Sequence, residues 1–582
     1  MKHFKEVIQI RERWAYRTIW QFTVLFNLLW IFTGTPALAL TPIDVNNMTT
    51  RAQAEGDQTT APSILLFCLG DSLSHGTMDA TNNETNTLNA YVQLVADALE
   101  SEIPLYFQQP FFDDNENRIE PFVVPTNLGV DGGDIFSLIG LEYYKRVGED
   151  KSFFSRDLLA DKLFPSRLKD KYDKVLYPIN LLAQKSVSQL SAANWLIRDG
   201  APMIGIKEAI GIMWEGNNDS SSAALGTGGR NPMFQPMPFD VIKSELKPGL
   251  RLLLGFGEAV GALSFEPYTQ AAIERNLTDT DDFAKMYEFV VKVLEFVHTQ
   301  SPVDTDLFLL TLPYYSAVGY LMDSDDLEYY LQKLEPTYSV PESFKRVNLP
   351  NEPLSGDRIS LLTYGLMYAF LSSGHSVAEV NQVLETGGVQ RDGLVLSEAE
   401  QQFIMTRIDA FNAAIKSAAA SIGSNVYVMD IGGYLNDVLT GKEPIVVDGR
   451  VLTRKWIRGS GFCLDGVHPG YLGQALIANF VITFMNPILG LEAELYHLPD
   501  IIKIDPYVDH DEDGWAPGPQ YEASGITELL FLFTDPDDTD PNVGVSLPPD
   551  IWDLISDILL REILNIPQIQ EEAIRQGIIA RQ

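Results

Sequence analysis

The chain alternates between short apolar runs and longer segments with helical spacing. Apolar residues recur every three or four positions in 91–99, 283–297 and 404–415, which predicts amphipathic helices. The runs typical of buried strands cover residues 64–69, 210–214, 307–312 and 426–429. Residues 105–125 are expected to contain the second strand, and within them 122–124 are strand-like. Strands that alternate with helices in this way predict an α/β fold built on a parallel sheet.

The first 39 residues have a different pattern. A basic start is followed by an apolar run at 19–32 and an Ala37-Leu38-Ala39 end, which is typical of a secretory signal peptide cleaved after Ala39. An uncleaved membrane anchor is the alternative. Residues 40–60 are rich in Thr, Asn and Gln and predict a flexible leader. Later segments have no uninterrupted apolar run of about 18 residues, so we expect no stable membrane span in the mature chain.

Composition and charge narrow the function classes. The chain has 582 residues, of which 45% are hydrophobic, so a large core and more than one domain are expected. Its formal net charge is −37. A surface this acidic repels nucleic acids and anionic membranes, so we expect no nucleic-acid partner. Together with the signal peptide, it suits a secreted, periplasmic or cell-surface protein.

The first apolar run leads into a polar turn, Gly70-Asp71-Ser72-Leu73. A buried strand would deliver Ser72 to the carboxyl edge of a parallel sheet, where open α/β folds bind their ligands. Gly, Asp and Ser are also common turn residues, so an ordinary turn is the alternative. A serine becomes a nucleophile only beside a base and an orienting acid.

A base and an acid occur far along the chain. Asp465 and His468 are three residues apart in a loop that precedes the apolar helical run 475–484. Such a loop lets the carboxylate contact one ring nitrogen and hold the tautomer that a general base requires. Of the seven histidines, only His468 has an aspartate at this spacing in such a loop. The alternative is that His468 merely caps its helix.

Two further segments carry donors for an oxyanion. Residues 125–134 contain Asn127 and the glycines Gly132 and Gly133, and residues 216–219 read Gly-Asn-Asn-Asp. Backbone N–H groups and an asparagine amide are suitable oxyanion donors. Each segment alone is a commonplace loop, but their order with the serine and histidine segments is specific.

This order of four segments resembles the GDSL, or SGNH, family of serine hydrolases. The resemblance implies that Ser72 is the nucleophile, His468 the base and Asp465 the orienting acid. It also implies an oxyanion hole formed by the N–H groups of Ser72 and Gly132, with Gly133 as the alternative, and by the Asn218 side chain. The expected fold is a flavodoxin-like three-layer α/β/α arrangement with about five parallel strands. The rival Gly-x-Ser-x-Gly signature does not occur in the chain.

The resemblance also suggests a domain layout. The hydrolase domain would cover residues 61–495, with insertions at about 220–275 and 316–395 that lengthen the separation of Ser72 from His468. Residues 496–582 would form an acidic C-terminal extension that ends in an apolar helical stripe at 551–563. That stripe is expected to pack on the main domain, with a partner-binding or anchoring helix as the alternative.

The two cysteines and an acidic segment raise further questions of chemistry. Cys68 and Cys463 both come near the predicted site, where either a disulfide or two free buried thiols would fit. Asp509, Asp511, Asp513 and the following glycine match the opening of a calcium loop. The twelfth loop position is Gln520 rather than glutamate, and Glu522 is a substitute for it. Calcium binding and a solvated acidic linker are the two interpretations.

The sequence therefore predicts a secreted carboxylic-ester hydrolase that needs no cofactor for its reaction. An acyltransferase with the same triad and a non-catalytic surface protein on the same fold are the alternatives. Lipids, short-chain esters and acetylated glycans all remain open as substrates, and so does the oligomeric state. Asn218-Asp219-Ser220 is a glycosylation sequon, and a glycan there would block the oxyanion hole. This favours a bacterial source.

Overall fold

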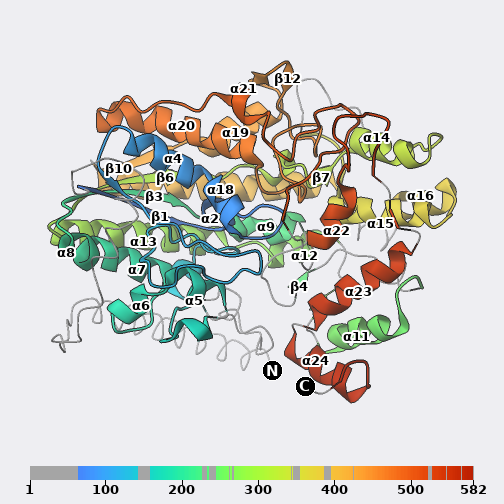
Figure 1. Cartoon of the computed structure of the whole chain (residues 1–582), viewed down its shortest axis with the longest axis horizontal. Helices are drawn as coiled ribbons and strands as arrows, with labels where there is room; N and C mark the ends of the chain where they lie inside the picture. Colours follow the sequence, from blue (N-terminus) through green and yellow to red (C-terminus); the bar gives the residue numbers. More distant parts are fainter. Residues whose placement is uncertain are drawn as a thin grey trace, which may run out of the picture. The chain divides into compact units, whose positions relative to one another are not determined.

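The computed structural model describes most of the chain after residue 62 (Figure 1). The described residues are 63–141, 158–168, 170–225, 233–234, 244–260, 263–264, 268–342, 344, 354–385, 395–423, 425–521, 527–545, 547–548, 550–564 and 566–580. The predicted signal peptide and leader lie outside these ranges. Residues 59–582 form one compact unit.

A parallel sheet of five strands lies at the centre of this unit, in the order β10-β6-β3-β1-β2. Its strands are β1 (Ile64–Gly70), β2 (Leu105–Tyr106), β3 (Glu208–Trp214), β6 (Asp304–Leu310) and β10 (Val426–Met429). The α/β class and the five parallel strands are therefore confirmed. β1 and β3 are buried along almost their whole length, which explains why both read as continuous apolar runs.

The second strand lies within the predicted segment 105–125, but not at its strand-like residues 122–124. Residues 122–124 form no strand, and the Phe122 side chain is 61% exposed. The second strand is instead the two-residue β2, paired with the start of β1. The apolar pattern at 122–124 therefore did not reflect burial in the sheet.

The principal helices follow the predicted amphipathic segments. α4 (Tyr91–Glu100) packs against α20 (Tyr471–Leu489), and α13 (Thr280–Gln300) packs against α18 (Glu398–Ile422). A capping box opens α18, because Ser397 and Glu400 each accept a hydrogen bond from the other's backbone N–H.

α20 is the one described helix that is long and apolar enough to cross a membrane. In this structure 56% of its apolar window is buried inside the protein, where the helix packs against α4 (Figure 1). This burial is what a core helix of the fold requires.

The second insertion contains more than helices. It includes α14 (Ser324–Leu334), α15 (Leu361–Ser372) and α16 (Val377–Glu385). A small antiparallel sheet of β7 (Leu321–Met322), β8 (Arg358–Ser360) and β9 (Val395–Leu396) joins them. In the first insertion, α11 (Pro248–Ala259) and α12 (Gln270–Arg275) are the described helices.

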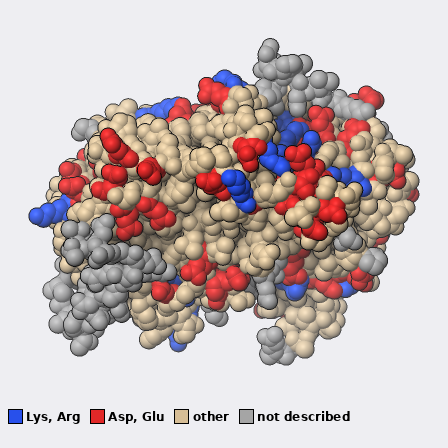
Figure 2. All heavy atoms as spheres, turned by 45° about the horizontal axis from the view of Figure 1, so that its top comes forward, with Lys and Arg blue, Asp and Glu red and all other residues tan. Residues whose placement is uncertain are grey.

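The C-terminal extension packs on these insertions. It contains α21 (Leu498–Ile501), α22 (Thr527–Leu530), the 3₁₀ turn η8 (Phe531–Phe533), α23 (Ile551–Ile563) and α24 (Pro567–Arg575). Both α23 and α24 contact α11 (Figure 1). The apolar stripe of the last long helix is thus covered by the protein itself. Acidic side chains are spread over the outer surface in Figure 2, as the net charge requires.

A buried ion cluster ties the second insertion to the segment that precedes Asp465. Asp323 is 3% exposed, and it is bonded to Arg454 and to Lys455, whose Nζ lies 2.7 Å from Oδ1. Burial alone would raise the pKa of Asp323, but the charges of Arg454, Lys455 and Arg358 hold it well below its ordinary value. The carboxylate therefore stays ionised and keeps these cations paired.

We expect Asp323→Ala to lower the free energy of unfolding by about 3–5 kcal/mol, because it leaves buried guanidinium groups unpaired. Asp325→Ala, on the exposed side of the same helix turn, should cost less than about 1 kcal/mol. Urea denaturation of both variants measures the difference. Equal stabilities would show that the ion cluster contributes nothing to the fold.

Candidate active site

Ser72 stands where β1 ends and the short helix α2 (Ser72–His75) begins. The Asp71 side chain caps this helix by accepting a hydrogen bond from the Leu73 N–H at 2.9 Å. The Ser72 residue is 8% exposed. Gly70 leaves space for the sharp turn, since a Cβ there would lie 2.2 Å from the Ser74 hydroxyl oxygen.

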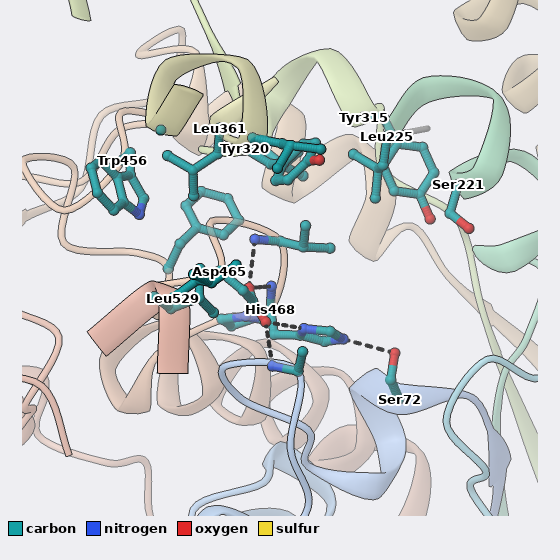
Figure 3. Close-up of a pocket in the computed structure, with 18 of the residues that line it drawn as sticks. Ser72, Ser221, Leu225, Tyr315, Tyr320, Leu361, Trp456, Asp465, His468 and Leu529 are labelled. Atoms are coloured by element: carbon teal, nitrogen blue, oxygen red, sulfur yellow. Dashed lines mark hydrogen bonds and ion pairs between the residues drawn. The ribbon is translucent and has the colours of Figure 1, made fainter. Parts of the chain in front are cut away.

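The structure brings the three predicted catalytic residues together. His468 Nε2 lies 2.9 Å from Ser72 Oγ, and His468 Nδ1 lies 2.6 Å from Asp465 Oδ2 (Figure 3). A proton on Nδ1 donates to the carboxylate and leaves Nε2 to accept from the serine hydroxyl. This is the geometry that general-base activation of a serine requires.

The Asp465 carboxylate is held by backbone groups on both sides. Oδ1 accepts from the N–H groups of Val467 and His468, and Oδ2 accepts from the Ala80 N–H at 2.9 Å. Burial alone would raise the pKa of Asp465, but the His468 charge and these hydrogen bonds lower it to about 2. The group is therefore an anion at neutral pH.

That anion sets the basicity of the imidazole. Burial alone would lower the pKa of His468, but the nearby charges of Asp465, Asp131 and Asp71 raise it above 6.5. Asp131 is itself paired with Lys171, which lines the same cavity. The ring is consequently a stronger base than a free imidazole.

The predicted oxyanion donors lie around the same cavity as Ser72. Gly132 lines the cavity with a φ of 75°, whereas the N–H of Gly133 donates to the Val130 carbonyl oxygen at 2.9 Å. The geometry therefore favours Gly132 over Gly133. Asn218 lines the cavity at the start of α9 (Asn218–Leu225), and its amide donates to the Gly133 carbonyl oxygen at 2.8 Å. This bond fixes the amide beside the glycine loop.

The neighbouring Asn217 has a role that sequence reasoning missed. Its side-chain amide donates to Asp71 Oδ2 at 3.0 Å, and its backbone carbonyl oxygen accepts a hydrogen bond from the Tyr315 hydroxyl at 2.7 Å. Asp71 thus connects the turn after β1 with the turn after β3. The doubled asparagine was the available signal, but the pattern alone does not say which of the two contacts Asp71.

The cavity itself has a volume of about 660 Å³, with Ser72 and His468 in its wall. Beyond these polar groups the wall is mostly apolar, as Figure 3 shows for Leu361, Leu225 and Leu529. The wall combines both insertions with the C-terminal extension, through residues that include Leu254, Leu366, Leu532, Phe533, Ile551, Ile555 and Leu559. Sequence reasoning placed the extension outside the site, because no local pattern reveals which distant helices meet.

Cys463 borders the triad, since its N–H donates to the His468 carbonyl oxygen at 2.9 Å, whereas the acidic loop lies apart from the reacting groups. Cys68 and Cys463 are both free and buried, so the disulfide interpretation is wrong. Cys463 Sγ instead accepts a hydrogen bond from the Asp79 N–H at 3.2 Å. Asp509, Asp511 and Asp513 lie together in one loop outside the cavity wall, while Glu522 lies outside the described residues.

Comparison of the chain with protein-family models finds no match, and comparison with curated proteins finds no significantly similar sequence. The functional argument therefore rests on the geometry of the site.

We expect Asp131→Asn to lower the pKa of His468, because it removes a negative charge that stabilises the imidazolium and leaves the Lys171 charge nearby. NMR titration of protein labelled with ¹³C-histidine measures this pKa directly. Asp114→Asn removes one exposed charge from the same region of the chain and serves as the control. An unchanged or higher pKa in the Asp131 variant would contradict this electrostatic account.

Proposed function

We propose that this protein is a serine hydrolase of the GDSL, or SGNH, class that cleaves carboxylic esters. The observation that supports this most strongly is the hydrogen-bonded row Ser72–His468–Asp465 in the wall of an apolar cavity. The four sequence segments that resemble the family supply its reacting groups in the same order along the chain.

The fold is best interpreted as a flavodoxin-like three-layer α/β/α arrangement. Numbered along the chain, the central strands run 2-1-3-4-5 across the sheet, which is the order of the flavodoxin-like group. The strand order reverses between β1 and β3, and such sheets bind ligands at the carboxyl ends of the strands beside this point. Ser72 follows β1 and Asn218 follows β3. The site therefore occupies the position that this topology favours.

The proposed reaction proceeds through an acyl-enzyme. His468 Nε2 takes the hydroxyl proton as Ser72 Oγ attacks the ester carbonyl carbon. The N–H groups of Ser72 and Gly132 and the Asn218 amide stabilise the oxyanion. The protonated His468 then donates its proton to the departing alkoxide. In the second half, water loses a proton to His468 as its oxygen attacks the acyl carbon. The bond from that carbon to Ser72 Oγ then breaks, His468 returns the proton to Ser72 Oγ, and the acid leaves.

The cavity favours esters with long apolar acyl chains. A volume of about 660 Å³ lined mostly by Leu, Ile and Phe exceeds what an acetyl group occupies. Each buried methylene contributes about 0.8 kcal/mol to binding, so a long chain gains the most from this wall. Acetylated glycans, which are polar beyond the acetyl group, fit such a wall poorly. With the predicted signal peptide, we place this reaction outside the cytoplasm.

Ser72→Ala should lower hydrolysis of p-nitrophenyl esters by roughly 10⁴-fold or more, since the nucleophile is lost. The wild-type protein should prefer palmitate and butyrate to acetate in kcat/KM. Ser101→Ala removes an exposed hydroxyl just after α4 and should leave kcat/KM for all three esters unchanged. Activity retained by a folded Ser72 variant would exclude this serine. Transfer of the acyl group to an added sugar or lipid hydroxyl in preference to water would identify an acyltransferase instead.

Asn218→Ala should lower kcat by roughly 10²–10³-fold while KM changes little, because the amide acts on the developing oxyanion. Asn486→Ala removes an asparagine amide near the far end of α20 and controls for loss of stability. Circular dichroism and thermal denaturation establish that both variants fold. Wild-type kcat in a folded Asn218 variant would show that this residue is not part of the oxyanion hole.

A further inference from the structure

An acidic cluster joins two segments of the C-terminal extension that the sequence places about twenty residues apart. The loop 509–514 supplies Asp509, Asp511 and Asp513, and the segment after η8 supplies Asp535 and Asp538. The two segments run side by side, because the Asp535 N–H donates to the Ala516 carbonyl oxygen at 2.8 Å and Ala516 pairs with Thr534. The sequence had indicated the first segment only.

Oxygen atoms of Asp511, Asp513 and Asp535 lie within 4.8 Å of one another. Oxygens bound to a single calcium ion at about 2.3–2.6 Å are separated by at most about 5 Å, so one ion can reach all three carboxylates. Gly514 has a φ of 100°, and a Cβ there would lie 2.5 Å from the Tyr329 hydroxyl oxygen. Glycine is required at this place, which is also the sixth position of a calcium loop.

Each carboxylate is fixed through one oxygen. The N–H groups of Asp513, Trp515 and Asp537 donate to Asp511, Asp513 and Asp535 at 3.0, 2.8 and 2.9 Å. These bonds orient the side chains without neutralising them. The carboxylates are thus held in position before any ligand arrives.

The remaining oxygens are the observation that points to a ligand. Asp535 is only 3% exposed, and its Oδ2 atom has no hydrogen-bond partner among the described residues. Asp511 Oδ2 and Asp509 Oδ1 also have no hydrogen-bond partner among the described residues. The Asp509 residue is 4% exposed. A buried carboxylate oxygen without a partner is costly unless a cation binds it.

The protein's own cations do not meet this need. Lys333 donates to the Asp513 carbonyl oxygen, and Arg450 lies 3.7 Å from Glu512. Within the described part of the chain, no lysine or arginine forms an ion pair with Asp511, Asp513 or Asp535. Asp538 differs from the others, since it accepts hydrogen bonds from the His510 backbone and ring at 2.9 and 2.5 Å.

We propose that Asp511, Asp513 and Asp535 bind a calcium ion that fastens the segment 527–535 to the loop 509–516. Calcium accepts carboxylate oxygens in irregular arrangements of six to eight ligands, whereas magnesium demands a near-ideal octahedron at shorter distances. Asp509 lies beside Asp511, and its Oδ1 atom, which has no hydrogen-bond partner among the described residues, adds negative charge next to the proposed site.

The position of this site gives it a consequence for the cavity. Trp515 follows one ligand segment, and Phe533 precedes the other. Their rings stack with an interplanar angle of 24° and centroids 6.1 Å apart. Phe533 and the preceding Leu529, Leu530 and Leu532 all line the cavity. A cation that joins the two segments therefore holds one wall of the cavity in place.

Calorimetric titration of calcium chloride into the chelator-treated full-length protein tests the site without reference to any reaction. We expect saturable binding and a Tm that rises with calcium. Asp535→Asn and Asp511→Asn should each weaken binding by at least about tenfold and abolish the Tm shift. Asp537→Asn, an exposed carboxylate on the same segment, is the matched control and should bind as the wild type does. Absence of saturable binding, a preference for magnesium, or wild-type binding by both ligand variants would overturn the proposal.

The effect on the cavity wall rests on the proposed ester hydrolysis and has its own readout. Calcium removal should raise KM for p-nitrophenyl palmitate by roughly fivefold or more, since the acyl chain loses part of its wall, and should change acetate hydrolysis less than about twofold. Equal effects on both esters would contradict the link between the ion and the wall. Calcium binding by a protein that hydrolyses no ester would refute the proposed function and leave the metal site standing.

Discussion

The hydrogen bonds to the Asp465 carboxylate hold together segments that are far apart in the sequence. One oxygen accepts from its own loop, and the other accepts from the His468 ring and from Ala80, 385 residues earlier. Asp79 and Ala80 adopt φ values of 52° and 57°, which residues with side chains rarely do. The strain at this turn places the Ala80 N–H against the carboxylate. Without these bonds the imidazole would lose the orientation that makes its free nitrogen a base.

Around this centre, the fold divides its tasks between the sheet and its additions. β1 and β3 fix the turns that carry Ser72 and Asn218, because parallel pairing in register aligns their carboxyl ends. The insertions and the extension supply the cavity wall instead. They also support the catalytic loop, since the Gly466 carbonyl oxygen accepts from the Tyr320 N–H at 2.7 Å and Trp456 Nε1 donates to the Leu464 carbonyl oxygen. In the proposed hydrolysis, the reacting groups and the walls that would recognise the substrate thus lie on different parts of the chain.

The sequence predicted the parts of this structure that local patterns determine. The buried strand β3 and the helix α4 appear within about two residues of their predicted bounds, because apolar periodicity acts over short distances. Ser72, Asp465 and His468 were predictable since each occurs in a distinctive turn. Two free buried cysteines were one of the two interpretations that the sequence left open. The role of Asn217 and the joining of Asp535 to the acidic loop were not predicted. They depend on which distant segments pack together, and the apolar but exposed Phe122 shows that hydrophobicity alone does not reveal this.

The separation of Ser72 from His468 by 396 residues has a consequence for biosynthesis. The serine leaves the ribosome early, but its base follows only after four-fifths of the chain, and the wall residue Ile563 emerges later still. A nascent chain therefore exposes an inert hydroxyl. The hydrogen-bonded row can form only after His468 has emerged and its loop has packed against the turn after β1, so the candidate site is completed late in synthesis.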